Sequence, residues 1–282
     1  MIERVDSLNY PSGSVVPEAA TTLEREGHCV LRSVFSPAEI DALRAEMLDV
    51  YARVPAEMRQ SAITPEVGEM YRYWMFHHSP LCQRAIARRE ILDVLEPLLG
   101  GDCHVIACTS WRNPPGNALT PNGLQWHVDG GPHVPRAEGV PWPVNIAYPV
   151  FIVAVHIHLQ DVTAADGPTA CIPGSHMSGR VPPFERRWDL DLEYAGRGAV
   201  QHLVRAGDVD CRVSDVWHRR WPPTPEAKGR FFLQTNYARR DIAQRVLPAE
   251  QVNHASPESL ARARDDRERR LLGLHPQGYF DA

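Results

Sequence analysis

The sequence predicts a mainly β protein, a sandwich or barrel with helices packed around it. Proline is one reason: its 25 copies outnumber the 19 glycines, and proline interrupts helix interiors, which disfavours a helical bundle. Apolar spacing is another, because short β-like runs alternate with Pro, Gly, Asn and Asp from residue 103 onward. The 282 residues contain no linker-like or low-complexity stretch, so we expect a single domain, 1–282.

The first part of that domain, residues 1–102, is expected to be mostly helical with one early strand over 28–35. Ser36, Pro37 and Glu39 take the N-cap, N1 and N3 positions of a capping box, which begins a helix. Apolar residues recur along this helix at helical spacing, so one side of it should face a core: Ile40, Leu43, Met47 and Val50.

A second helix is expected from Ser79 through Leu99, because Ser-Pro opens it and Gly-Gly ends it. The β core is expected over 103–240. Its β-like runs are 103–111, 124–128, 150–159, 169–172, 209–213 and 230–237. A helical extension, 241–282, completes the chain, with a densely charged helix over 256–272 whose charges are expected to face solvent.

Composition excludes several classes of partner. A net charge of −5 gives no basic footprint for nucleic acid, and no run approaches the roughly 20 apolar residues that span a bilayer. The N-terminus has early acids and no apolar run, so we expect no secretory signal. The six cysteines contain no CxxC pair and are expected to be reduced, buried thiols of a cytoplasmic protein.

A candidate metal site begins with a histidine and an aspartate two residues apart, His127 and Asp129. Residues i and i+2 of a strand project to one face, so an imidazole and a carboxylate would lie side by side. With a distant second histidine they would form the two-histidine, one-carboxylate triad that holds Fe(II) and leaves coordination positions open. Alone, the pair is equally compatible with a hydrogen-bonding surface histidine.

His218 is the candidate second histidine, because its distance along the chain places it on another strand. The alternative is a core histidine bonded to a carbonyl. Arg230, twelve residues later, opens an otherwise apolar strand. A buried arginine is costly without a carboxylate, and a bound dicarboxylate would supply one. An edge arginine that reaches solvent is the alternative.

These residues resemble the phytanoyl-CoA dioxygenase family of Fe(II)- and 2-oxoglutarate-dependent oxygenases. The resemblance covers about residues 103–237 and rests on His127-Val128-Asp129, Asp166-Gly167-Pro168, Ile172-Pro173-Gly174-Ser175-His176, Gly207-Asp208, His218 and Arg230. It implies a double-stranded β-helix, a cupin-like jelly-roll barrel with helices against one sheet. It also implies an enzyme that uses Fe(II), 2-oxoglutarate and O₂ and releases succinate and CO₂.

Carried over to this chain, the resemblance implies that His127, Asp129 and His218 bind iron. It implies that Arg230 binds the distal carboxylate of 2-oxoglutarate, and it places His156 where an aromatic residue often contacts the same molecule.

Three further positions bear on the resemblance. His176, just after a Pro-Gly turn, becomes a structural residue rather than a ligand. Arg220 departs from the family, which often carries a small hydroxyl residue two places after the distal histidine. Asp129 is present where related halogenases have a small residue, which disfavours halogenation.

The substrate is expected to be a small molecule, hydroxylated at an aliphatic C–H, with secondary metabolism suggested by analogy. Desaturation or ring closure are the alternatives, and the oligomeric state is left open. Proline-rich segments 130–145 and 180–191 are expected to form ordered lids. Candidate substrate or lid residues, each of which could instead pack within its own segment, are Trp111, Arg112, Asn113, His133, Trp142, Arg187 and Trp188.

Two other functions fit parts of the pattern. A non-catalytic cupin-type binding protein would have a similar barrel but no need for a buried Arg230. A hydrolytic zinc site could use the same three ligands, yet it explains neither Arg230 nor the Pro-Gly-Ser-His element. The dioxygenase interpretation accounts for both features.

Overall fold

The computed structural model describes residues 16–56, 69–116, 124–140, 142–143, 145–242 and 255–275. Helices in these parts are α1 (Glu18–Glu26), α2 (Pro37–Arg53), α4 (Met75–His78), α5 (Pro80–Ala85), α6 (Arg89–Leu99), α7 (Pro257–Arg262) and α8 (Asp266–Leu271), with short 3₁₀ helices η1 (Ala164–Asp166), η2 (Ser175–Ser178) and η3 (Phe184–Arg186). The strands are β1 (His28–Leu31), β2 (Tyr71–Tyr73), β3 (His104–Asn113), β4 (Ile152–His158), β5 (Thr169–Cys171), β6 (Val200–Gln201), β7 (Val209–Val213), β8 (His218–Arg220) and β9 (Arg230–Ala238).

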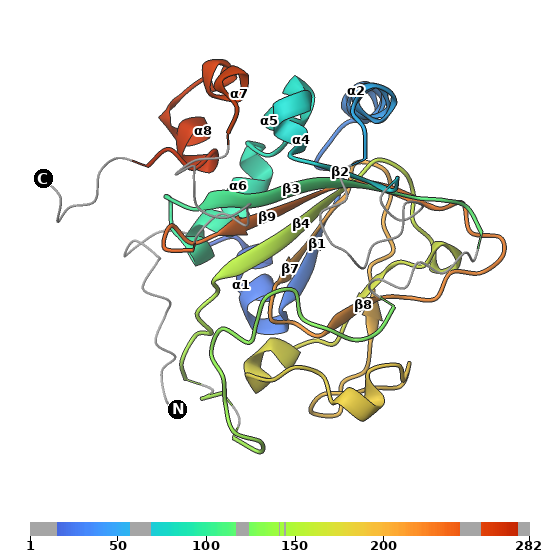
Figure 1. Cartoon of the computed structure of the whole chain (residues 1–282). Helices are drawn as coiled ribbons and strands as arrows, with labels where there is room; N and C mark the ends of the chain where they lie inside the picture. Colours follow the sequence, from blue (N-terminus) through green and yellow to red (C-terminus); the bar gives the residue numbers. More distant parts are fainter. Residues whose placement is uncertain are drawn as a thin grey trace, which may run out of the picture.

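These strands form two antiparallel sheets. The larger has the order β1-β7-β4-β9-β3-β2, and the smaller has the order β6-β5-β8 (Figure 1). A single bridge between His127 and His218 lengthens the smaller sheet by one more segment. Helices α2, α4, α5, α7 and α8 lie against the large sheet on the side away from β8, so the fold is mainly β with flanking helices, of the jelly-roll kind, as predicted.

The two faces of the large sheet differ in chemistry, because alternate residues of a strand point to opposite sides. The outer face is apolar and joins the helices in the main hydrophobic core, through Val153, Val155, Ile157, Val209, Cys211, Val213 and Leu233. The opposite face carries buried polar side chains instead, among them His156, His158, Asp210, Arg212 and Arg230. Burial energy therefore comes from the helix side, and the space between the sheets is left for polar chemistry.

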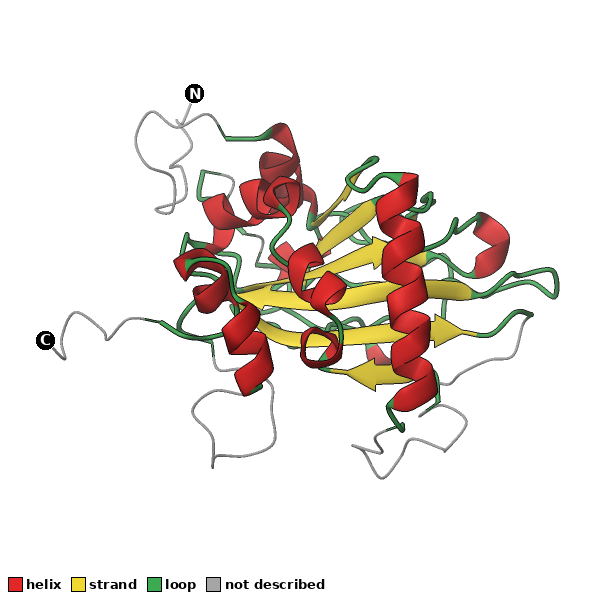
Figure 2. Ribbon diagram, turned by 90° about the horizontal axis from the view of Figure 1, so that it is seen from above, coloured by secondary structure: helices red, strands yellow, loops and turns green. Residues whose placement is uncertain are grey.

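Helix α2 begins as predicted. The Ser36 hydroxyl accepts a hydrogen bond from the Glu39 N–H, and the Glu39 carboxylate accepts one from the Ser36 N–H at 2.8 Å. Its predicted apolar stripe is buried in the main core: Ile40, Leu43, Met47 and Val50. Figure 2 shows the long helix α2 crossing the strands of the large sheet.

Two predicted helices are each broken in two. The helix expected from Ser79 to Leu99 breaks after Ala85, where the Ile86 carbonyl accepts a hydrogen bond from the Tyr237 hydroxyl at 2.7 Å. The helix expected over 256–272 breaks because Asp265 caps a new start, accepting from the Glu268 N–H at 2.8 Å. Local tertiary and capping bonds thus override the continuous helical pattern in both places.

The strands also differ from expectation at three places. The early strand ends at Leu31, and Ser33 takes a left-handed φ of 53°. The run 124–128 contributes only the bridge at His127. Strands β2 and β8 carry no alternating apolar signal and were not predicted.

All six cysteine thiols are free and buried, as expected. Within the described residues, no helix is both long enough and apolar enough to cross a membrane.

Candidate metal centre

His127 and His218 face each other across the edge of the small sheet. Their backbones exchange two hydrogen bonds of 3.0 Å, and their ring centres lie 4.2 Å apart. Each ring donates its Nδ1–H to a carbonyl two residues earlier: His127 to Gln125 at 2.8 Å and His218 to Val216 at 2.9 Å. These bonds fix the tautomer and leave both Nε2 lone pairs available to a common ligand.

Asp129 completes this group. Its Oδ1 lies 3.8 Å from the His127 Nε2 and 3.4 Å from the His218 Nε2. Its N–H donates to the Ser214 carbonyl at 3.0 Å, and its Oδ2 accepts from the Arg212 Nη2 at 3.2 Å. One carboxylate oxygen is therefore held by arginine while the other faces the two imidazoles.

The protonation states suit a cation. Burial, followed by the nearby His218, lowers the pKa of His127 to about 4, so its ring is neutral near pH 7. Burial alone would raise the pKa of Asp129, but His218 and Arg212 outweigh it and hold that pKa well below its usual value. Two imidazole nitrogens and one carboxylate oxygen, all within 4.8 Å, form a donor set that fits Fe(II) and related divalent ions.

A second histidine–aspartate group lies between the sheets, formed by His156, His158 and Asp210. Part of its donor set already has partners within the protein, whereas the His158 Nδ1 and the Asp210 Oδ1 have no hydrogen-bond partner among the described residues. The His158 Nε2–H donates to the Asp210 Oδ2 at 2.6 Å, and the His156 Nε2 accepts from the Arg212 Nη1 at 2.9 Å. The group is therefore a buried hydrogen-bonded cluster whose chemistry does not call for an ion.

Beside the metal group lies a cavity of about 90 Å³. Its walls come from both sheets and are formed by Trp111, His127, Asp129, His156, Thr169, Arg212, His218, Arg219, Arg220, Arg230, Phe232 and Gln234. Four of these are arginines, so the cavity has a cationic character that matches an anionic ligand.

Arg230 is held on this wall by Asn113, which stands opposite it in the β3–β9 register and accepts from its Nε at 3.1 Å. Only 6% of Arg230 is exposed, and no described carboxylate lies within ion-pair distance of it. Burial and then the charge of Arg220 lower the pKa of Arg230 well below its usual value. An anion in this cavity would relieve both effects.

His156, expected beside 2-oxoglutarate, lies on the wall of the same cavity, with its ring centre 4.4 Å from that of Phe232. Trp111 also lies on this wall. Asn113 acts through Arg230, as described above. Arg112 lies elsewhere: it is exposed, with its guanidinium 6.0 Å from the centre of the Tyr51 ring.

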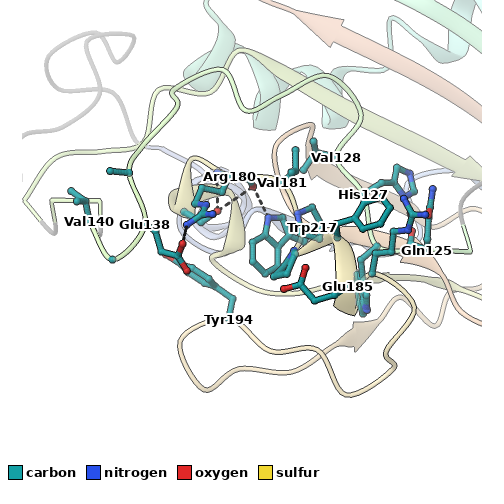
Figure 3. Close-up of a pocket in the computed structure, with 18 residues that line it drawn as sticks. Gln125, His127, Val128, Glu138, Val140, Arg180, Val181, Glu185, Tyr194 and Trp217 are labelled. Atoms are coloured by element: carbon teal, nitrogen blue, oxygen red, sulfur yellow. Dashed lines mark hydrogen bonds and ion pairs between the residues drawn. The ribbon is translucent and has the colours of Figure 1, made fainter.

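A larger cavity of about 930 Å³ lies next to His127, the residue that borders both cavities (Figure 3). Segments 137–140 and 180–187 form its far walls, joined by an ion pair of 2.7 Å between Arg180 and Glu138. Arg187, a predicted substrate residue, lies on this wall and stacks on Phe184 at 3.9 Å.

The other predicted lid residues do not lie on the walls of either cavity. His133 binds the buried Asp215 through both its N–H and its Nδ1, at 2.8 and 2.5 Å. Trp142 donates its Nε1–H to the Ile146 carbonyl at 2.7 Å. Trp188 is 54% exposed. Pro141 and Val144 of the predicted lid 130–145 lie outside the described residues.

Three residues of this region were missed from the sequence: Arg212, which binds Asp129, Asp210, which binds the histidine cluster, and Asp215, which fixes the loop after Asp129. For Arg212 and Asp210 the sequence did contain a signal. Strand β7 reads Val-Asp-Cys-Arg-Val, so its polar residues alternate with apolar ones and must share one face.

Comparisons with known proteins find similar sequences. The sequence profile of the family described as phytanoyl-CoA dioxygenase matches residues 23–219. An ectoine dioxygenase of Bordetella parapertussis is 25% identical over 256 residues, which cover 80% of this chain and 79% of that protein. An ectoine dioxygenase of Halomonas elongata is 25% identical over 244 residues, covering 78% and 69%.

Solved structures share the fold. EctD from S. alaskensis, with 2-oxoglutarate and 5-hydroxyectoine, superposes with a TM-score of 0.63 at 22% identity, covering 92% of this chain and 89% of that one. HygX from Streptomyces hygroscopicus, with nickel and 2-oxoglutarate bound, superposes with a TM-score of 0.60 at 16% identity, covering 84% and 93%.

Proposed function

Because this chain belongs to the phytanoyl-CoA dioxygenase family, we propose that it is an Fe(II)- and 2-oxoglutarate-dependent dioxygenase that hydroxylates an aliphatic C–H of a small molecule. The observation that carries the proposal is the convergence of His127, Asp129 and His218 beside a cavity lined with arginines. A secondary-metabolite substrate is part of the proposal.

Each residue of the site has a separate task. His127, Asp129 and His218 would hold the ion through two imidazole nitrogens and one carboxylate oxygen. Arg230 would bind the distal carboxylate of 2-oxoglutarate, and Asn113 keeps the Arg230 guanidinium in place. Iron with 2-oxoglutarate and O₂ supplies the oxidising chemistry, in which 2-oxoglutarate becomes succinate and CO₂.

The substrate is proposed to occupy the larger cavity, which His127 borders. Its walls combine apolar residues such as Trp217 and Val181 with charged residues such as Arg187 and Glu185. Such a lining suits an amphipathic small molecule. The ion pair of Arg180 with Glu138 links the two wall segments.

The proposed unit is one oxygenase domain over 1–282. In support, the main hydrophobic core contains residues from Ala20 of α1 to Leu272 just after α8. Six buried thiols support a reducing, cytoplasmic compartment.

The test is succinate formation from 2-oxoglutarate by protein loaded anaerobically with Fe(II) and then exposed to air. We expect Fe(II)-dependent succinate release that zinc inhibits. Changing His127, Asp129 or His218 to Ala should abolish iron binding and succinate release, and Arg230→Ala should weaken 2-oxoglutarate while leaving iron bound.

The matched control is His176→Ala, because His176 is buried and bonded to the Glu24 carbonyl away from the proposed ligands. A folded His176→Ala that loses iron, beside a His218→Ala that keeps full activity, would refute the ligand assignment. A substrate screen that includes ectoine tests the reaction type: gain of one oxygen atom indicates hydroxylation, and loss of two hydrogens indicates desaturation or ring closure.

A further inference from the structure

Arg220, at the end of β8, is a buried cation for which no described side chain supplies an anion. Only 5% of the residue is exposed, and its Nε and Nη1 have no hydrogen-bond partner among the described residues. Burying a guanidinium without a compensating carboxylate is strongly unfavourable, so a fold that keeps one there calls for an anionic ligand.

The neighbours of Arg220 strengthen this requirement. Arg220 and Arg230 lie on the wall of the same small cavity, and the charge of Arg220 is the largest effect on the pKa of Arg230 after burial itself. Arg212, a third arginine of that wall, is different because it is paired with Asp129 at 3.2 Å. The two unpaired cations repel each other, and one carboxylate between them would stabilise both.

The backbone around Arg220 is shaped to hold its side chain. Gly167 has a φ of +70°, and a Cβ there would lie 3.1 Å from the Arg220 Nε and 2.7 Å from the Trp221 carbonyl oxygen. A side chain at position 167 would therefore collide with the backbone beside the guanidinium. The Asp-Gly-Pro turn thus lies close against the head of Arg220.

The fourth arginine of the wall, Arg219, differs because it donates to the Trp188 and Arg220 carbonyls. We propose that Arg220 and Arg230 jointly bind the distal carboxylate of 2-oxoglutarate, so that Arg220 is a second specificity-determining residue for a dicarboxylate. The inference rests on the proposed function. Each planar guanidinium offers a fork of N–H donors, and two forks on one carboxylate satisfy more of its lone pairs than one arginine does. Strand β8 carries both this residue and the proposed ligand His218, two positions apart on the same face.

The proposal predicts opposite effects of the Arg220 side chain on two quantities. It should increase the affinity for a dicarboxylate and decrease the stability of the ligand-free protein. Removing Arg220 should weaken dicarboxylate binding about ten- to hundred-fold, the range for a lost charge-assisted hydrogen bond. In the ligand-free protein the same change removes a buried repulsive charge, so the melting temperature should rise by a few degrees.

The experiment uses Arg220→Ser, Arg220→Lys and the charge-matched control Arg89→Ser, which removes a 67% exposed arginine of α6. Anaerobic calorimetry with Ni(II)-loaded protein measures 2-oxoglutarate affinity. Thermal shift of metal-free protein with glutarate, which has the distal carboxylate but no keto group to chelate a metal, measures the guanidinium end alone. We expect reduced binding in Arg220→Ser, partial recovery in Arg220→Lys and no change in Arg89→Ser.

The outcomes distinguish this inference from the proposed function. Wild-type affinity for both probes in Arg220→Ser, or in Arg220→Lys should the serine variant not fold, overturns the role of Arg220 even if the enzyme turns over. Glutarate stabilisation that depends on Arg220 supports the role even if no Fe(II)-dependent succinate appears, in which case only the proposed function fails.

Discussion

Between the sheets, the carboxylate of Asp129 is held in one orientation by its neighbours. Asp129 has two oxygens with different neighbours: Oδ2 accepts from Arg212, and Oδ1 faces the Nε2 atoms of His127 and His218. Arg212 is itself held, because its Nη1 donates to His156 at 2.9 Å. A residue that never touches the proposed metal therefore fixes how one of its ligands is oriented.

Removing that support should weaken metal binding without removing any ligand. For Arg212→Gln we expect the affinity for Fe(II) or Ni(II) to fall about ten- to hundred-fold, the usual effect of losing a partner behind a ligand. Arg212→Lys should recover part of the loss, because the ammonium keeps the charge near Asp129. Metal titration by calorimetry measures it, and unchanged affinity in a folded Arg212→Gln would show that Asp129 needs no such support.

Among the elements, helix α2 lies far from the candidate site but packs against the sheet that carries part of it. Its apolar stripe packs in the main core, and Arg44 donates its Nε–H to the Leu159 carbonyl at 2.9 Å, just beyond β4. The helix thus covers the sheet whose opposite face carries His156 and Arg230.

The start of α2 can be tested alone, because its capping box is exposed at the surface. Ser36→Ala removes the acceptor of the Glu39 N–H and should cost about 1 kcal/mol, the usual value of an N-cap. Chemical unfolding measures the loss. Ser36→Asp keeps an acceptor and should stay near the wild-type stability, and equal losses in both variants would argue against a capping effect.

The loop that follows Asp129 is held in place by one buried residue, Asp215. Asp215, in the turn between β7 and β8, accepts from the His133 N–H and from the Tyr148 hydroxyl at 2.7 Å. These partners lower the pKa of Asp215 although burial alone would raise it. The Asp215 carboxylate therefore connects both ends of the segment 133–148 to the turn that precedes His218.

The molecule as a whole buries several neutral histidines, and this fixes how it responds to acid. Burial lowers the pKa of His28 and of His156 to about 3, and that of His176 to about 4, although the carboxylates Asp215 and Glu26 near His176 act in the opposite direction. The unfolded chain takes up protons near pH 6.5, whereas the folded chain does so only near these lower values. Stability should therefore fall as the pH decreases from about 6.5 to about 4.

His202 does not share this window. Its pKa is raised to about 10, although burial acts to lower it, because Cys171 and Asp210 favour the proton. Below pH 6.5 it is protonated in both states and its contribution to stability is complete, and that contribution is lost as the pH rises from about 6.5 toward 10.

His176 offers a test of the acid response. His176→Gln keeps a donor for the Glu24 carbonyl but cannot titrate. Between about pH 6 and 4.5 the slope of the unfolding free energy should decrease by about 1.4 kcal/mol per pH unit, the value for one proton. Urea unfolding at several pH values measures it, with pH 7.5 as the internal reference. An unchanged slope would mean that His176 does not titrate as a buried neutral ring.

Local pattern was sufficient for some parts of this protein. The capping box and stripe of α2, the strands β4, β7 and β9, and the His127–Asp129 pair all follow from spacing, because strand and helix periodicities decide which side chains share a face. The breaks at Ile86 and Asp265 were not predicted from spacing. At Ile86 the reason is that the Tyr237 hydroxyl, which donates to the Ile86 carbonyl, is 151 residues away in sequence.

The sequence by itself determined the fold class, the apolar helix-facing side of the large sheet and the candidate ligands. The tertiary structure decided which polar groups meet: Arg212 with Asp129, Asn113 with Arg230, and Arg220 beside Arg230 without an acid. The physical reason is the distance along the chain over which each kind of pattern acts. Periodicity acts within a few residues of one strand, whereas the contacts of Arg212 with Asp129 and of Asn113 with Arg230 depend on tertiary packing that brings together segments more than 80 residues apart.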